Sequence, residues 1–169
     1  MKLNWAERWV VNNPSRVLQQ RAEIHWFRKR SALSPGAVAL EIGCGRGAGA
    51  DLILSAFQPE VLHAMDLDID MIHRAGRYLS PSRRQRISMY VGDALHLPHP
   101  SQSLDAVFGF GVLHHIPDPD PVVRAVHAAL PVGGRFGIWV YGHEGNEWYL
   151  RLAEPLRRNT APCVAYAAN

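Results

Sequence analysis

The sequence predicts a three-layer α/β sandwich with a mainly parallel sheet of about five strands in the order 3-2-1-4-5. Apolar runs alternate with segments of helical periodicity along most of the chain. Some runs, such as LDAVFGFGVL at 104–113, are apolar at nearly every position, which is typical of parallel strands buried on both faces. Glycine, proline and charged residues mark the turns between the runs.

The first segment, residues 1–34, is predicted as an N-terminal helical cap. Its second helix, at about 15–30, follows Asn13 and Pro14, a cap and first-turn pair. The expected apolar stripe of this helix consists of Val17, Leu18, Ile24 and Phe27. Trp5 and Trp9 are four residues apart and are expected to pack the first helix onto the domain, with cover over a bound ligand as the alternative.

The core is predicted at 35–142 and the tail at 143–169. Strands are expected at 37–43, 60–68, 87–94, 104–113 and 135–142. Helices are expected at 48–57, at 70–79 and from Asp120 to the stop at Pro131 and Gly133–Gly134, with a polar turn at 81–86. In the tail, residues 146–158 are compatible with a helix, and no strand pair is evident.

Composition is typical of a globular chain, with 169 residues, 47% apolar and 20% charged. The net charge of +3 is too small to indicate nucleic-acid binding. Cys44 and Cys163 lie far apart and suggest no disulfide framework, so a cytoplasmic location is expected. No run approaches the roughly 20 apolar residues of a membrane-spanning helix.

Four alternating glycines follow the first predicted strand. Gly43, Gly45, Gly47 and Gly49 come directly after Glu41 in LEIGCGRGAGADLIL. Loops at the carboxyl ends of parallel strands face the ligand, and glycines there let a ligand lie on the backbone. A tight turn explains one or two glycines, whereas four in alternation beside an acid favour a ligand site.

Two ligand classes fit this loop. GCGRGA matches the dinucleotide pattern G-x-G-x-x-G/A, which places a pyrophosphate at the helix N-terminus. The alternative is S-adenosylmethionine, whose sulfonium and ammonium outweigh its one carboxylate. Glu41, Asp66 and Asp93 stand at the ends of three predicted strands, with Arg46 as the one opposing charge. Three carboxylates suit a cation and disfavour a pyrophosphate.

Five motifs, in order and properly spaced, resemble those of the class I S-adenosylmethionine-dependent methyltransferases, in the group that shares the methyltransferase type 11 domain. The likeness covers about residues 36–140, and the motifs are LEIGCGRG, AMDLDIDMI, VGDALHLP, SLDAVFGFGVLHHI and ALPVGGRF. The resemblance implies a Rossmann-like fold, S-adenosyl-L-methionine as cofactor and methyl transfer to a small-molecule acceptor, with no nucleic-acid partner.

The resemblance also implies roles for individual residues at the methionine and ribose. Glu41 and the backbone of Gly43, Gly45 and Gly47 would hold the methionine moiety. Asp66 would accept hydrogen bonds from both ribose hydroxyls. Asp66 is also a candidate helix cap, although Asp68 and Asp70 are better placed for that role.

The adenine would lie between Leu67 and Met71, although Met71 fits a core position equally well. Asp93 would accept a hydrogen bond from the adenine amino group, and the Ala94 N–H would meet a ring nitrogen. The alternative for Asp93 is a simple turn after Gly92.

The reacting methyl would lie beside Phe110 and Gly111, followed by His114 and His115 where an acceptor approaches. In-line transfer needs no catalytic residue, but a base helps a hydroxyl or amine acceptor. His115 and His114 are the candidates, against the alternative that one packs under the loop. Weaker candidates follow the fifth strand: Tyr141, His143 and Glu144. No ligand set has the spacing of a metal site, and Cys44 is expected to contribute backbone only.

The chain departs from this family after the fifth strand, because the usual sixth and seventh strands are not recognisable in 143–169. The expected consequence is an exposed fifth-strand edge able to self-associate. The basic clusters at 28–30 and 83–86 are typical of solvated helix ends rather than of a membrane-contacting surface. A non-catalytic or truncated S-adenosylmethionine-binding domain and a nicotinamide-dependent oxidoreductase remain as alternatives.

Overall fold

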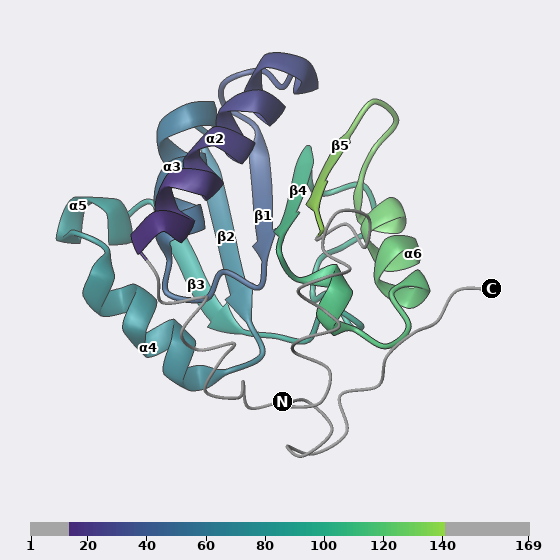
Figure 1. Cartoon of the computed structure of the whole chain (residues 1–169). Coiled ribbons are helices and arrows are strands. Elements are labelled where there is room, and N and C mark those ends of the chain that lie inside the picture. Colours follow the sequence, from purple (N-terminus) through teal and green to yellow (C-terminus); the bar gives the residue numbers. More distant parts are fainter. Residues whose placement is uncertain (1–13, 141–169) are drawn as a thin grey trace, which may run out of the picture.

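A computed structural model describes residues 14–140, which fold around a five-stranded parallel sheet with helices on both faces (Figure 1). The strand order β3-β2-β1-β4-β5 confirms the predicted order. All four strand pairings are parallel. The strands are Val38–Ile42 (β1), Val61–Asp66 (β2), Ile87–Val91 (β3), Ala106–Phe110 (β4) and Arg135–Trp139 (β5).

The helices of the described region are Pro14–Ser31 (α2), Ala48–Phe57 (α3), Ile69–Tyr78 (α4), Pro81–Arg84 (α5) and Asp120–Ala129 (α6), with a 3₁₀ turn at Leu113–His115 (η1). The polar turn predicted at 81–86 is therefore wrong in part, because its first four residues form α5. Pro81 occupies the first position after an extended Ser80, where the fixed φ of proline suits a helix and its missing N–H costs nothing.

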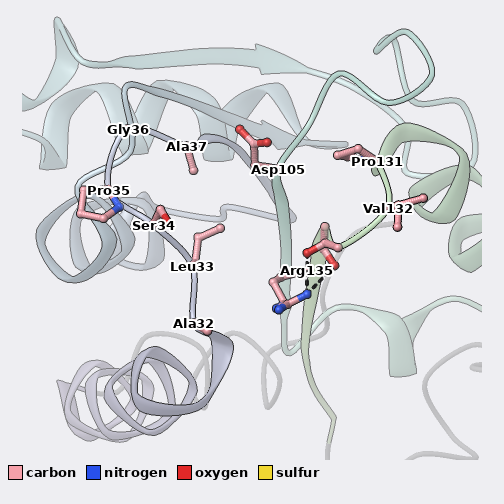
Figure 2. Close-up of a pocket in the computed structure, with 12 residues that line it drawn as sticks. Ala32, Leu33, Ser34, Pro35, Gly36, Ala37, Asp105, Pro131, Val132 and Arg135 are labelled. Carbon is pink, nitrogen blue, oxygen red and sulfur yellow. Dashed lines mark hydrogen bonds between the residues drawn. The ribbon is translucent and has the colours of Figure 1, made fainter.

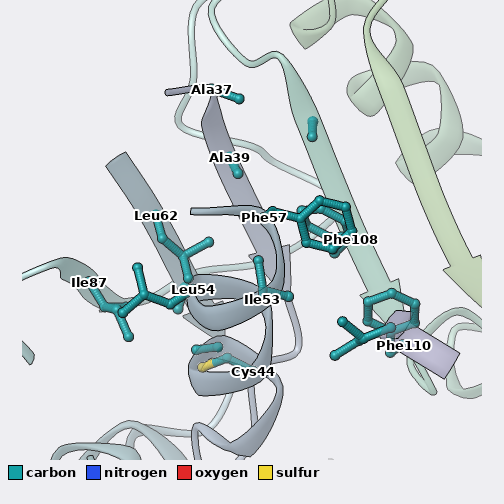
Figure 3. Close-up of a cluster of buried hydrophobic side chains, with 14 of the residues drawn as sticks. Ala37, Ala39, Cys44, Ile53, Leu54, Phe57, Leu62, Ile87, Phe108 and Phe110 are labelled. Carbon is teal, nitrogen blue, oxygen red and sulfur yellow. The ribbon is translucent and has the colours of Figure 1, made fainter. Parts of the chain in front are cut away.

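One core lies between the sheet and the layer of α2, α3 and α4. Figure 3 shows its aromatic part, where Phe57 of α3 meets Phe108 of β4 with ring centroids 5.0 Å apart. The Phe27 ring of α2 joins them, 5.7 Å from Phe108. A Cβ on Gly137 would lie 2.7 Å from the Phe27 ring, so only glycine lets α2 pack this closely on β5.

The second core lies on the opposite face, under α6. Val122, Val126 and Ala129 of α6 are buried in one cluster with Leu40 and Val107 of the sheet. The spacing of the three α6 residues gives the helix one apolar face. The two cores hold the sheet in a three-layer arrangement.

The predicted apolar stripe of α2 is wrong at Leu18, which is 69% exposed. Ile24 is buried and Phe27 packs against the core, as expected. Leu18 lies six residues before Ile24, a rotation of about 600° that leaves it about 120° from the buried face. Leu18 therefore points away from the core.

The basic clusters make contacts within the chain. Arg28 donates to the Ala56 carbonyl at 3.0 Å, and Arg83 pairs with Asp51 at 3.1 Å. Arg30 lies over the Trp26 ring, 4.3 Å from its centroid. The first two contacts fasten α2 and α5 to α3, and the third lies within α2. Within residues 14–140, no helix has the length and apolar character needed to cross a membrane.

The last described strand, β5, pairs only with β4 among the described residues, and Ile138 and Trp139 are 41% and 37% exposed. Self-association through this strand stays a prediction. Several expectations lie outside the described residues: Trp5, Trp9, Tyr141, His143, Glu144, the tail helix and the missing sixth and seventh strands.

Candidate functional site

The candidate site lies at the carboxyl ends of the strands, where the loops contact one another. The Cys44 N–H donates to the Met65 carbonyl at 2.9 Å, and the Gly92 N–H donates to the Asp66 carbonyl at 3.0 Å. A Cβ on Gly43 would lie 2.3 Å from Val112 Cγ2, so the loop after β1 packs directly against the loop after β4. The four strand ends therefore form one continuous edge.

Gly45 presents the most open backbone of the glycine loop. It has a φ of +53°, and a Cβ there would meet nothing within 4 Å. Its N–H donates to Asp66 Oδ2 at 2.8 Å. Asp66 Oδ1 accepts from the Asp68 N–H at 3.0 Å. The amide that a bound pyrophosphate would need is thus already bonded to a carboxylate.

Gly47 and Gly49 allow neighbouring elements to pack closely and do not expose backbone to a ligand. A Cβ on Gly47 would lie 3.0 Å from the Ala75 Cβ of α4. A Cβ on Gly49 would lie 1.9 Å from Glu41 Oε1 and 2.7 Å from Gln20 Nε2. The four alternating glycines therefore have different roles: Gly45 is open, while Gly43, Gly47 and Gly49 admit neighbouring side chains.

Glu41 is a buried carboxyl in β1, only 2% exposed. Burial raises its pKa to about 8, and the charge of Asp66 adds to the effect. Glu41 Oε2 is buried and has no hydrogen-bond partner. A buried, unpaired carboxyl of this kind is stabilised by a cation or a hydrogen-bond donor.

Asp68, rather than Asp66, caps α4, as the sequence indicated, because its side chain accepts from the Asp70 N–H at 2.8 Å. Asp66 lies at the end of β2, where it faces Gly45. Each carboxylate oxygen has two lone pairs, so the two backbone bonds of Asp66 leave acceptor capacity for hydroxyl donors.

The predicted adenine residues differ in exposure. Leu67 is 59% exposed, whereas Met71 is half-buried and Ala94 is buried beside the α6 core. Asp93 Oδ1 accepts from the Leu95 N–H at 2.9 Å, and its other oxygen lies 3.7 Å from the His96 ring nitrogen. Asp93 therefore forms the turn that the sequence offered as an alternative, which leaves its ligand role a prediction.

Phe110, the last residue of β4, and Gly111, which follows it, differ in their surroundings. The Phe110 ring is buried and lies 5.9 Å from the Phe108 ring, so its side chain belongs to the core (Figure 3). Gly111 has a φ of +77° and donates its N–H to the Trp139 carbonyl at 2.8 Å. Only the backbone at this point faces the site.

The two candidate histidines lie next to each other in η1, with ring centroids 4.0 Å apart. Partial burial lowers the pKa of His114 to about 4, with contributions from His115 and Arg16. His114 is therefore neutral near pH 7 and is a weak proton acceptor. His115 stays the other candidate for a base, next to His114 in η1.

Two polar residues of α2 reach this edge and a third pairs with one of them, and the sequence analysis missed all three. A Cβ on Gly111 would lie 3.3 Å from Arg16 Nη2, and Arg16 pairs with Glu23 at 2.6 Å. Gln20 reaches Gly49 and Glu41. The available signal was the i, i+4, i+7 spacing of Arg16, Gln20 and Glu23, which places all three on one face of α2.

Cys44 is a buried free cysteine. Burial, followed by the charges of Glu41 and Asp66, raises the pKa of the Cys44 thiol, so it stays protonated and inert. Among residues 14–140, no group of three or more His, Cys, Asp or Glu side chains is arranged to hold a metal ion.

A separate pocket opens at the amino ends of β1, β4 and β5 (Figure 2). The 32–37 loop, Asp105 and the 131–135 turn line it. The Arg135 guanidinium donates to the Ser31 carbonyl at 2.7 Å and to the Gly133 carbonyl, which ties α2 to β5. This pocket lies at the opposite end of the strands from the glycine loop.

Comparison with known proteins decides between the ligand classes. A methyltransferase domain family matches residues 40–138, which is more than half of the chain. The chain belongs to this methyltransferase family. The resemblance to class I S-adenosylmethionine-dependent methyltransferases is therefore confirmed, and membership implies S-adenosylmethionine as the methyl donor. The oxidoreductase alternative loses its support.

Two curated relatives show how far the likeness extends. The chain is 33% identical over 108 residues to phosphoethanolamine N-methyltransferase 2 of Caenorhabditis elegans, covering 64% of this chain and 24% of the relative. It is 31% identical over 115 residues to demethylmenaquinone methyltransferase of Lactobacillus johnsonii, covering 66% and 47%. The methyltransferase chain thus spans less than half the length of these relatives.

The fold is confirmed by a solved structure. A putative S-adenosyl-L-methionine-dependent methyltransferase from Methanococcus maripaludis superposes with a TM-score of 0.66 at 18% identity, covering 86% of this chain and 67% of that one. The five-stranded parallel sheet in the order 3-2-1-4-5 thus has the Rossmann-like fold of that structure.

Proposed function

We propose that this chain binds S-adenosylmethionine at the carboxyl edge of its sheet and transfers the methyl group to a small organic acceptor. The observation that carries the proposal is the acidic glycine loop, where Asp66 accepts from the Gly45 amide and Glu41 lies beneath with an unpartnered oxygen. The Asp66 carboxylate repels a pyrophosphate and attracts a sulfonium and an ammonium, and a bound cation would favour the ionised form of Glu41. Residues 35–142 would form the cofactor core, between the 1–34 cap and the 143–169 tail.

The bound cofactor supplies a methyl group on a positively charged sulfur, and the protein supplies position and a dry pocket. Asp66 accepts hydrogen bonds from the ribose hydroxyls with its remaining lone pairs. The exposed Leu67 offers an apolar surface to the adenine, and Asp93 with the Ala94 amide lies at its far edge. Glu41 receives the ammonium end.

His115 would accept a proton from a hydroxyl or amine acceptor, a role typically worth about 10²–10⁴-fold in rate. Its neighbour His114 stays neutral near pH 7 and adds no opposing charge. The names of the relatives include a phosphoethanolamine and a demethylmenaquinone methyltransferase, so the acceptor is proposed no further than a small organic molecule. A cytoplasmic location, inferred from the two distant cysteines, goes with this proposal.

Calorimetry with S-adenosylhomocysteine and NADH tests the cofactor. Micromolar or tighter binding of the nucleoside alone is expected, and binding of NADH alone would overturn the proposal. Incubation of the full chain with S-adenosylmethionine and a panel of amine, hydroxyl and carboxylate acceptors then tests catalysis. Release of S-adenosylhomocysteine that depends on one acceptor is expected. Binding with no release on any acceptor would favour a non-catalytic binding domain.

A further inference from the structure

The outer face of α2 is exposed along the helix and carries cations without acids. Ile24 and Phe27 hold the opposite side of α2 on the core. At 100° of rotation per residue, the outer face covers about half of the helix circumference, with Ala22 near its middle. The members of this face that carry charge or apolar surface are Leu18, Arg21, Ala22, Trp26, Lys29 and Arg30, all of them exposed.

An apolar row runs along the middle of this face. Leu18, Ala22 and Trp26 follow one another at intervals of four residues, so they lie one above the other on the helix. Leu18 is 69% exposed and Trp26 is 52% exposed. A single exposed leucine is ordinary, but a row that ends in a large aromatic side chain is typical of a contact surface. The packing of the fold does not account for the exposure of Leu18, and a contact surface does.

Three cations flank the apolar row. Arg21 lies about 100° to one side of Ala22, and Arg30 lies about 80° to the other side. Lys29 follows beyond Trp26. The Arg30 guanidinium lies over the Trp26 ring, 4.3 Å from its centroid, so a cation and an aromatic ring are presented together. Long basic side chains beside an apolar row lay their stems along it and extend their charged ends outward.

No acidic side chain of α2 opposes these cations. The only acid in the helix is Glu23, which is 5% exposed and pairs with Arg16 at 2.6 Å. Arg28 turns inward and donates to a carbonyl of α3. A basic cluster such as 28–30 is by itself typical of a solvated helix end, but its last two residues share their face with Trp26. The outer face therefore carries three positive side chains and no negative one.

An anionic lipid surface matches this combination better than other partners do. Lipid phosphates attract Arg and Lys, and Trp and Leu side chains enter the boundary between headgroups and acyl chains. A nucleic acid would use the cations and leave the exposed Leu18 in water. A second copy of the chain in a two-fold contact would place like charges against each other.

We propose that the outer face of α2 docks on an anionic lipid surface, with Leu18 and Trp26 entering the headgroup region and the three cations pairing with lipid phosphates. Near an anionic bilayer each cation strengthens binding roughly fivefold, so the three together contribute about 10²-fold. Arg16, near the start of the same helix, lies beside Gly111, so docking holds the candidate site close to the bilayer. The inference is independent of the proposed function.

Co-sedimentation of the full chain with lipid vesicles tests the proposal. Vesicles of phosphatidylcholine with about 30% phosphatidylglycerol should bind at least about tenfold more tightly than vesicles of phosphatidylcholine alone, and about 0.5 M salt should remove most of this difference. Lys29→Glu should weaken binding to the anionic vesicles at least about tenfold. Arg124→Glu is the matched control, because it makes the same change of net charge at an exposed position of α6, on the opposite face of the sheet. It should change binding less than about twofold.

Leu18→Gln separates entry into the lipid from a purely ionic contact. It keeps every charge, removes an exposed apolar side chain, and should weaken binding to the anionic vesicles at least about threefold. All three substituted positions are exposed, so the urea midpoints of the variants should match that of the unchanged chain. The proposal fails if Leu18→Gln binds as tightly as the unchanged chain, if Lys29→Glu and Arg124→Glu lose equally, or if neither kind of vesicle binds.

Two further measurements test other occupants of the outer face. A monomer that binds anionic vesicles more tightly than duplex DNA is expected. Tighter binding to the duplex, lost in Lys29→Glu, would assign the face to a nucleic acid and overturn the lipid contact. A dimer in light scattering that Leu18→Gln converts to a monomer would assign the face to a second copy of the chain, with the same consequence.

Discussion

The carboxyl group of Glu41 occupies the space that a side chain at Gly49 would fill. A Cβ on Gly49 would lie 1.9 Å from Glu41 Oε1 and 3.0 Å from its Cδ. Glu41 is enclosed in the sheet and α3 begins at Ala48, so neither partner has room to retreat. The last of the alternating glycines thus exists for a buried acid rather than for the ligand.

Gly49→Ala is therefore expected to lower the free energy of unfolding by about 1–3 kcal/mol, the usual cost of an overpacked core. Gly76→Ala is the matched control, because a Cβ on Gly76 of α4 would meet nothing within 4 Å. Alanine there should raise stability by about 0.5–1 kcal/mol through its higher helix propensity. Urea unfolding measures both, and equal stability of the two variants would contradict the assigned role of Gly49.

The pKa of Glu41 predicts a pH-dependent stability. Burial, and then Asp66, raises the pKa of this carboxyl from 4.5 to about 8 in the folded chain. The folded chain holds a proton that the unfolded chain releases above pH 4.5, so the stabilisation is complete below that pH and is lost as the pH rises to about 8. The free energy of unfolding should fall by about 1.4 kcal/mol per pH unit in this window.

Glu41→Gln removes this titration while keeping the shape of the side chain. The difference in unfolding free energy between the two chains isolates Glu41, because every other group titrates in both. Urea unfolding between pH 5 and pH 8 should give a flatter profile for the glutamine chain. Parallel profiles would show that Glu41 is already ionised in the folded chain at pH 5.

The strands were predictable from the sequence because parallel strands buried on both faces are apolar at nearly every position, and their order was implied by the resemblance to the methyltransferase family. The residues at which the strands end were not predictable in the same way. β4 stops at Phe110 although the apolar run continues through Leu113, because Gly111 adopts a φ of +77° that breaks the ladder and leads into η1. An apolar residue indicates a buried position, not a strand, and Leu113 is buried although it lies outside the strand.

The candidate site was predictable only where a motif lies in the loops. Glu41, Asp66 and the glycines stand in sequence next to strand ends, so their position on one edge follows from topology. Arg16 reaches the same edge through the packing of α2, which the contact of Phe27 with Gly137 fixes, and Glu23 pairs with it. The spacing of these residues shows that they share one face of the helix, but it does not show which part of the sheet that face meets.

Asp66→Ala is expected to weaken binding of S-adenosylhomocysteine at least about tenfold, because the substitution removes the acceptor that we propose for two ribose hydroxyls. It also removes the acceptor of the Gly45 amide and so loosens the glycine loop. Asp118→Ala is the control, since that carboxylate is exposed and only accepts from the Asp120 N–H at 3.2 Å. Calorimetry measures the affinity of both variants for S-adenosylhomocysteine. An unchanged affinity of Asp66→Ala would show that Asp66 is not part of the site.

His115→Ala is expected to lower turnover by about 10²-fold or more with an amine or hydroxyl acceptor, if proton removal accompanies methyl transfer. Affinity for S-adenosylhomocysteine should stay within about twofold of the unchanged chain, since the histidine would act on the acceptor. His114→Ala should have the smaller effect on turnover, because a group with a pKa of about 4 is a weak base near pH 7. His127→Ala, exposed on α6, serves as the control.

Turnover is measured by S-adenosylhomocysteine release and affinity by calorimetry. Full activity of His115→Ala would assign proton removal to solvent, and a parallel loss of cofactor affinity would make His115 part of the cofactor site instead.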